Sequence, residues 1–359
     1  MKRIKSLDTV RGMLMLHIVL IIHGIYWLVD KPHWTSSVLL FEMPAIFIVS
    51  GYSYYISENL RANKKSATMS AKAYFEYLTS RLTRILVPYF IYAMTCSGLL
   101  YILSLHKDYG LASNDLGKLF IAWANPLNYG NGFSLGLLNA HLWFIPVFLI
   151  VTALMPIATM FRPLKNPNIL SLIALIFLGE YILYKTNFFS KSVIIQSMFY
   201  LIFSLLGYYM ARNKNYFKST NFFNVSIFLG FFLVFVVIIK GDLHAMNMQA
   251  NKFPPNHIFF LFSCFWISIF LSIIYRFSKF AEKLEEYYDS LFLKPFITSG
   301  YSIYLWQGLG YTIAVWAGKS FDLPMFYVWV LAVSLSIVFG TFMAPFEKIR
   351  FSLSPSKQE

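Results

Sequence analysis

Hydrophobic residues gather in ten long runs along the chain, separated by more polar stretches. The runs fall at 9–29, 36–57, 85–105, 139–160, 168–184, 193–211, 221–240, 256–275, 295–317 and 322–344. Because an α-helix rises about 1.5 Å per residue, about 20 apolar residues cross the roughly 30 Å of hydrocarbon in a bilayer. The pattern therefore predicts an all-α fold, a polytopic transmembrane helical bundle with about ten spans.

The polar stretches carry a charge bias that orients these spans. With the N-terminus in the cytoplasm, 22 of the 30 Lys and Arg residues fall on the inner side, and the eight left outside are all lysines. Cytoplasmic loops are enriched in Lys and Arg. We therefore expect both ends of the chain inside, in a multi-pass protein of the cell (inner or plasma) membrane. Residues 1–348 are expected to form one transmembrane domain, and 349–359 a short cytoplasmic tail.

Composition excludes most other classes of protein. Of the 359 residues, 58% are hydrophobic and 13% charged, and the mean hydropathy is +0.59, whereas soluble domains carry about 25% charged residues. The net charge of +14 lies in short loops, so it indicates membrane orientation and a lipid partner, not a nucleic-acid partner. Cys96 and Cys264 lie in apolar runs without metal-ligand spacing, so neither a disulfide framework nor a metal site is expected.

Ionisable residues inside a bilayer are costly, so each one is a candidate for function. The candidates are His17, His23, Glu42 and Glu180, with His141 at the outer start of the fourth run. The alternative for each is a structural role, in which it forms a hydrogen bond between helices or reaches toward the interface. Glu180 is expected to be structural.

The first run places a base far from a cation. His23 follows Arg11 by twelve residues, which puts it about 18 Å deeper along a helix. A donor entering from the cytoplasm could hold its phosphates at Arg11 and extend its reactive end toward His23. On a straight helix His17 is turned by about 240° from His23, so we expect His17 to be structural.

Five short segments, in order, carry a resemblance. They are Ser6–Gly12 followed by His23, then Phe41–Tyr52, Arg81–Tyr89, His141–Pro146 and Tyr301–Trp306. Together they resemble the acyltransferase-3 family of integral membrane O-acyltransferases, which are cell-envelope carbohydrate O-acetylases. The resemblance covers residues 6 to 306.

The resemblance implies transfer of an acyl group, usually acetyl, from cytoplasmic acyl-CoA to a hydroxyl of an envelope or extracellular polysaccharide or its lipid-linked precursor. It also implies that Arg11 and His23 are essential. Arg81 and Arg84 become candidates for the CoA phosphates, because the guanidinium fork pairs bidentately with phosphate oxygens. Their alternative is ordinary anchoring on the inner side. Acyl-CoA (acetyl-CoA) would be a co-substrate, with no permanently bound cofactor.

In the mechanism that fits, neutral His23 takes the proton of the acceptor hydroxyl as its oxygen attacks the thioester. Glu42 could hold the imidazole tautomer as the acid does in hydrolase triads, or it could be an interfacial or pore-facing carboxylate.

Substrate-binding candidates are less sharply defined. For an oxyanion donor the candidates are Tyr52, Asn256 and Tyr301, and His141 and Trp143 open the fourth run. The stretch 251–257 could line an acceptor site or form a plain rigid turn. Further partners would be a carbohydrate acceptor and either a second copy of the chain or the polysaccharide-synthesis machinery.

Three features of the sequence depart from the family pattern. The interval from Arg11 to His23 is one residue longer than usual, which turns His23 by about 100° unless a bulge compensates. Glu42 stands where the closest subfamilies often have histidine, and Gln307 follows Trp306 where members commonly read Trp-His.

Two other functions compete with acyl transfer. One is a carrier or flippase without acyl chemistry, for which broken spans in symmetry-related positions would be expected, and no internal repeat is visible. The other is a non-catalytic descendant that senses or scaffolds. The sequence has no Gly-rich phosphate loop, metal-ligand cluster or nucleophile elbow, which favours direct transfer over a covalent enzyme intermediate.

Overall fold

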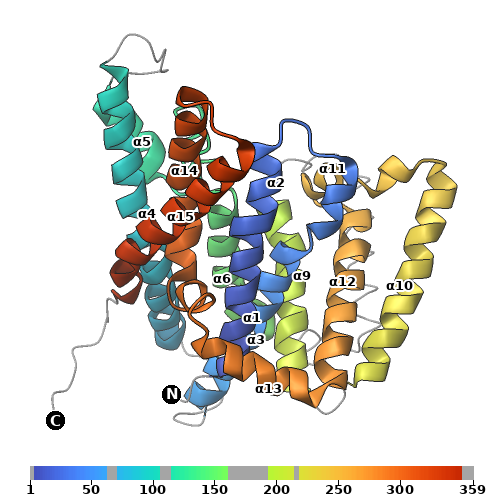
Figure 1. Cartoon of the computed structure of the whole chain (residues 1–359). Coiled ribbons are helices and arrows are strands. Elements are labelled where there is room, and N and C mark those ends of the chain that lie inside the picture. Colours follow the sequence, from blue (N-terminus) through green and yellow to red (C-terminus); the bar gives the residue numbers. More distant parts are fainter. Residues whose placement is uncertain (1–3, 63–70, 106–114, 161–192, 214–217, 350–359) are drawn as a thin grey trace. The chain divides into compact units, whose positions relative to one another are not determined.

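The structure is a computed structural model that describes residues 4–62, 71–105, 115–160, 193–213 and 218–349. Within these ranges the chain is helical and forms no β-sheet (Figure 1). The helices along the chain are α1 (Lys5–Leu16), α2 (His23–Leu28), α3 (Glu42–Ala62), α4 (Ala71–Ser104), α5 (Leu116–Ala124), α6 (Phe144–Met160), α9 (Val193–Arg212), α10 (Ser219–Lys240), α11 (Met248–Lys252), α12 (His257–Arg276), α13 (Ser278–Glu286), α14 (Lys294–Ser320) and α15 (Met325–Met343). The helical fold expected from the hydrophobic pattern is confirmed.

Nine of the ten apolar runs coincide with helices, and the run at 168–184, with Glu180, lies outside the described residues. In the described ranges seven helical stretches are long and apolar enough to cross a membrane: Lys5–Leu28, Trp34–Asn59, Lys72–Ser104, Val193–Arg212, Ser219–Lys240, His257–Arg276 and Met325–Lys348. The protein is therefore a multi-pass membrane protein. The count of ten spans, the orientation and the boundary at 348 stay predictions.

The described helices divide into two compact units. The first comprises Met1–Leu14, Lys31–Thr68 and Ile150–Ser290, and the second comprises Met15–Asp30, Met69–Leu149 and Leu291–Glu359. Each unit is thus assembled from segments far apart in the sequence, and the first long helical stretch contributes to both.

In the first unit, α3 and α9 cross at two glycines. A Cβ on Gly51 would lie 1.7 Å from the carbonyl oxygen of Ser204, and one on Gly207 would lie 2.0 Å from that of Ile48. Small residues of this kind let helix backbones approach closely inside a membrane. The glycine of the motif Phe41–Tyr52 therefore has a packing role.

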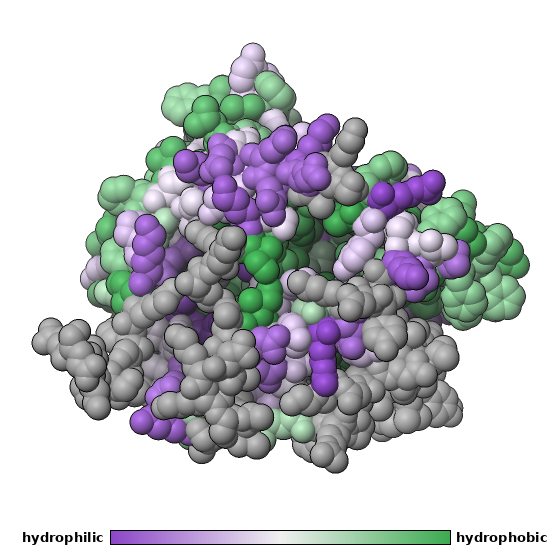
Figure 2. Space-filling model, turned by 90° about the horizontal axis from the view of Figure 1, so that it is seen from below, coloured by the Kyte–Doolittle hydropathy of each residue, from purple (hydrophilic) through white to green (hydrophobic). Residues whose placement is uncertain are grey.

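The first unit also contains the neighbouring helices α10 and α12, and the amphipathic α13 (Figure 1). Leu284 of α13 is buried. Asp289 follows the end of α13, and its Oδ2 forms an ion pair with Lys5 Nζ at 3.3 Å. Figure 2 views the face that carries α13 and shows hydrophilic side chains gathered there. This arrangement suits a helix that lies along a membrane surface.

The second unit is organised around α14, which packs along α15 and against α4 (Figure 1). Its aromatic core includes Tyr89, Tyr92, Trp123 and Trp306. α14 is kinked at Ser299, whose backbone angles are non-helical (φ −134°, ψ 19°).

Side chains satisfy the polar backbone that these irregularities expose. Beyond the kink, the backbone N–H of Ser302 donates to Glu347 Oε1 at 2.6 Å. In the turns before α6, the Tyr92 hydroxyl donates to the Leu138 carbonyl at 2.7 Å, and Trp123 Nε1 donates to the Phe133 carbonyl at 2.8 Å. Buried backbone polar groups need such partners, and these bonds fix the turn that carries His141.

Candidate active site

His23 is the first residue of α2 and lies half-buried in the second unit. Its Nδ1 is 2.7 Å from Oε1 of Gln307 on α14. An amide oxygen only accepts hydrogen bonds, so Nδ1 carries the proton and donates it. In neutral His23 the lone pair therefore lies on Nε2, the nitrogen that a general base would use.

A π-helical turn, His17–Ile22, precedes His23. The N–H of His23 bonds to the Ile18 carbonyl, five residues earlier. Such a turn absorbs one residue more than an α-helical turn. The bulge that would compensate for the longer interval after Arg11 is therefore present. The straight helix assumed between His17 and His23 is wrong, and the 240° separation does not apply.

Two side chains stabilise the π-helical turn. The Tyr311 hydroxyl donates to the Val19 carbonyl at 2.6 Å, and Trp329 Nε1 donates to the Leu20 carbonyl at 2.8 Å. A break in the α-helical ladder exposes backbone groups that must be satisfied inside a membrane. Because α14 supplies Tyr311 and α15 supplies Trp329, both helices fix the backbone just before His23.

Aromatic rings surround the imidazole of His23. Trp27, one turn later on α2, stacks on it with the ring centroids 3.9 Å apart and the planes 9° from parallel. Tyr304 and His141 each lie 6.5 Å from it, centroid to centroid. The site is therefore a half-buried base within an aromatic cluster.

His141 is buried in this cluster. Its Nε2 lies 3.0 Å from the Leu305 carbonyl, to which it donates, and its own carbonyl accepts from the Tyr304 hydroxyl. A Cβ on Gly308 would lie 2.6 Å from His141 Cε1, so only glycine lets α14 approach the ring this closely. Nδ1 of His141 has no hydrogen-bond partner among the described residues. The structure thus brings together the predicted residues His141 and His23.

The predicted phosphate-binding arginines have contacts of their own. Arg11, in the first unit, bonds to Asp8 Oδ1 and Ser53 Oγ, each at 3.2 Å. Arg81, in the second unit, lies over the ring of Tyr77 at 5.8 Å from its centroid, and Arg84 is exposed.

Glu42 has a partner that the sequence analysis did not propose. Its Oε1 accepts a hydrogen bond from Lys252 Nζ at 2.8 Å, and both side chains are almost fully buried in the first unit. The group that bonds to Nδ1 of His23 is the amide of Gln307. Gln307 thus bonds to the nitrogen foreseen for Glu42, whose catalytic role stays a prediction.

The remaining candidates have structural contacts. Asn256 caps α12, because its Oδ1 accepts from the N–H groups of Ile258 and Phe259, and its amide donates to Asn251. These bonds agree with the rigid-turn alternative for the stretch 251–257, and an acceptor site there stays a prediction.

Three aromatic candidates differ in their surroundings. The Tyr301 hydroxyl donates to the Ile85 carbonyl at 2.9 Å. Trp143 packs edge-on against Phe144, and Tyr52 is half-buried beside Ser53, the partner of Arg11.

Trp27 and the contact of Gln307 with His23 are not identified by the sequence alone. Trp27 stands four residues after His23, the spacing at which helical side chains meet. Gln307 was noted only as a departure from the family pattern. Its side chain is buried, and its Nε2 has no hydrogen-bond partner in the described part of the chain.

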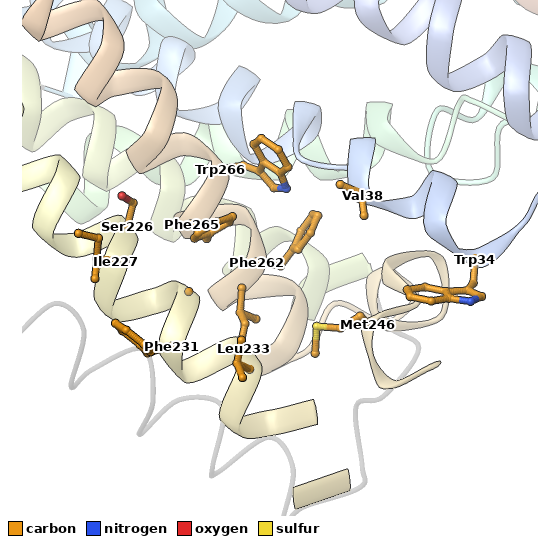
Figure 3. A pocket seen from close by; sticks show the side chains of 12 residues that line it. Trp34, Val38, Ser226, Ile227, Phe231, Leu233, Met246, Phe262, Phe265 and Trp266 are labelled. Atoms are coloured by element: carbon orange, nitrogen blue, oxygen red, sulfur yellow. The ribbon is translucent and has the colours of Figure 1, made fainter. Parts of the chain in front are cut away.

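A groove of about 640 Å³ lies between α10 and α12 of the first unit (Figure 3). Its lining is mainly apolar and aromatic and includes Trp34, Phe231, Phe262 and Trp266. Among the described residues, no ionisable side chain lines it. Acid–base chemistry needs titratable groups, so the groove is a weaker candidate for an active site than the cluster around His23.

Among the described residues, no group of three or more His, Cys, Asp and Glu side chains could hold a metal ion. No curated protein and no solved structure matches the chain. A family model for the acyltransferase domain of the acyltransferase-3 family matches residues 4–344. Since this match covers nearly the whole sequence, the chain belongs to the acyltransferase-3 family.

Proposed function

We propose that the protein is a membrane O-acyltransferase. It would move an acyl group, most simply acetyl, from cytoplasmic acyl-CoA to a hydroxyl of a cell-envelope or extracellular polysaccharide or its lipid-linked precursor. Membership of the acyltransferase-3 family supports acyl transfer in general. The donor, the acceptor and the cell membrane as location are parts of the proposal.

His23 acts as the general base. Nε2 takes the proton of the acceptor hydroxyl while that oxygen forms a bond to the thioester carbonyl carbon. The tetrahedral intermediate then collapses, the C–S bond breaks, and the proton on Nε2 passes to the leaving thiolate of CoA. General-base catalysis of this kind contributes about 10²–10⁴-fold.

One observation carries the assignment of His23. The hydrogen bond of 2.7 Å between Nδ1 and Gln307 Oε1 selects the tautomer whose lone pair lies on Nε2. A histidine held in this way, and half-buried beside aromatic rings, is prepared for proton transfer. The structural alternative does not require any particular tautomer.

Arg11 would bind the donor phosphates. The Arg11 side chain is 40% exposed although its guanidinium bonds to Asp8 and Ser53, so it retains surface for a phosphate. The hydrogen bonds to Asp8 and Ser53 fix the orientation of the guanidinium group. Arg81 and Arg84 are secondary candidates for the same phosphates.

The test compares two histidines of the same span. Purified protein in vesicles receives radiolabelled acetyl-CoA and crude envelope glycans, and label transferred to glycan is measured for wild type, His23→Ala and His17→Ala. We expect at least a 100-fold loss of transfer in His23→Ala, and at most a modest loss in His17→Ala. Equal activity of His23→Ala and wild type would remove His23 from the mechanism.

The carrier or flippase function gains no specific support from the described residues. It predicts that the protein moves a lipid-linked carbohydrate without consuming acyl-CoA. Wild type that neither binds nor consumes acyl-CoA in the same vesicles would favour it over acyl transfer.

A further inference from the structure

We propose that Trp27 is a positioning residue of the acyl-transfer site, whose indole face stabilises the positive charge that His23 carries while it holds the acceptor proton. The inference rests on the proposed function, because that function supplies the charged intermediate. It assigns to a tryptophan the work that a carboxylate does in hydrolase triads.

The stacking of the two rings is close and nearly parallel. The centroids of His23 and Trp27 are 3.9 Å apart, and the ring planes meet at 9°. The two residues are four apart on α2, so the helix itself brings their side chains together. The negative face of the indole therefore covers one face of the imidazole.

The indole is held in this position by its neighbours. Tyr311 packs edge-on against Trp27 at 5.1 Å and 89°, and His141 does so at 5.7 Å and 60°. Tyr311 is in turn fixed by its bond to the Val19 carbonyl. A ring supported on two sides can keep its face on His23 throughout the reaction.

His23 needs a group that stabilises its positive charge, because Gln307, its partner at Nδ1, does not supply one. Gln307 presents a neutral amide oxygen to His23, and an amide fixes the tautomer but adds no negative charge. Once Nε2 accepts a proton, the imidazolium lies half-buried, where water stabilises it less than in solution. A tryptophan face within about 6 Å attracts a cation, and the attraction grows as the pair is desolvated.

The expected effect is specific to the chemical step. Loss of the attraction should lower kcat by about 3-fold to 30-fold. The KM for acyl-CoA should stay unchanged, because the charge on His23 exists only during transfer. A merely structural Trp27 would not make kcat depend on the electron density of its ring.

The test replaces Trp27 site-specifically with tryptophans that carry one, two or three fluorine atoms. Fluorine withdraws electron density from the ring face and changes its shape little. We expect log kcat for transfer from acetyl-CoA to fall with each fluorine at constant KM. The matched control is the same series at Trp306, whose ring neighbours are Tyr92 and Phe339, and it should be flat. A flat series at Trp27 in an active enzyme would overturn the inference and leave the proposed function intact.

A second measurement does not depend on activity. The ¹⁹F resonance of protein with 5-fluorotryptophan at position 27 is followed by NMR as the solution is acidified, for wild type, His23→Gln and His141→Gln. The titratable groups with ring contacts to Trp27 are His23, His141 and Tyr311, and Tyr304 contacts both histidines.

We expect a change of ¹⁹F shift that His23→Gln abolishes and His141→Gln keeps. Lack of any transfer by wild type would refute the proposed function and with it the catalytic role of Trp27, and the spectrum would then test only the attraction between the indole and the charged His23. A shift that does not respond to His23 would overturn it.

Discussion

At the scale of single residues, the site depends on which nitrogen of His23 carries its proton. Gln307 settles this with one hydrogen bond to Nδ1. The hydrolase analogy favours a carboxylate for this purpose, and the sequence offers Glu42. The amide performs the tautomer selection without a buried negative charge, which would be costly inside a membrane.

We predict that Gln307→Leu lowers kcat about tenfold, because one hydrogen bond of about 1 kcal/mol is lost and the imidazole can adopt the wrong tautomer. Gln307→His, which restores the common family pair after Trp306, should keep most activity. Gln196→Leu makes the same change on α9 of the first unit and is the control. Acetyl transfer by Gln307→Leu at the wild-type rate would contradict the account.

His23 could be predicted from the sequence, whereas its partner could not. A histidine inside an apolar run after an arginine is visible without a structure, because polar residues there are rare. Gln307 lies 284 residues away, and its proximity arises only when α14 packs beside α2. Trp27 is the intermediate case, since its spacing from His23 predicts contact but not the orientation of the rings.

At the scale of helical elements, the π-helical turn His17–Ile22 explains the extra residue before His23. It should tolerate the loss of one residue by becoming α-helical. We predict that deletion of Ile21, an exposed residue of this turn, keeps acetyl transfer within about tenfold of wild type. The same deletion in α1, at Met13, rotates everything after it by about 100° and should abolish transfer. Equal loss in both deletions would contradict the role assigned to the π-helical turn.

The Glu42–Lys252 pair ties α11 to the start of α3 in the first unit. Removing one partner leaves a buried charge unpaired, so we predict that Lys252→Met or Glu42→Leu lowers the free energy of unfolding by about 3 kcal/mol or more. The double variant should recover most of this loss, as measured by thermal unfolding in detergent. If it also recovers acetyl transfer, Glu42 is structural. A stable but inactive double variant would return Glu42 to the catalytic candidates.

Helix positions followed well from the sequence because long apolar runs have few alternatives in a bilayer. The kink at Ser299 and the π-helical turn could not be predicted from the sequence. Both depend on partners from distant segments, namely Glu347 for the Ser302 N–H and Tyr311 and Trp329 for the π-helical carbonyls. A local pattern cannot reveal where a helix departs from regular geometry when tertiary contacts compensate for it.

At the scale of the whole molecule, the positive-inside bias predicts which loops face the cytoplasm. In a variant without Cys96 and Cys264, single cysteines at Thr35, Asn247 and Asp322 should react with a membrane-impermeant maleimide in intact cells. Cysteines at Asn213 and Ser290 should react only after the membrane is opened. The reverse labelling pattern would show that the protein has the opposite orientation in the membrane. Arg11 would then lie on the wrong side for a cytoplasmic donor.

The most direct test of acyl transfer is single-turnover transfer from radiolabelled acetyl-CoA to envelope glycan by purified protein in sealed vesicles. The account predicts that wild type and His17→Ala transfer label, and that His23→Ala binds acetyl-CoA but transfers at least 100-fold more slowly. Transfer by His23→Ala at the wild-type rate, or no consumption of acetyl-CoA by wild type with acceptor present, would contradict it.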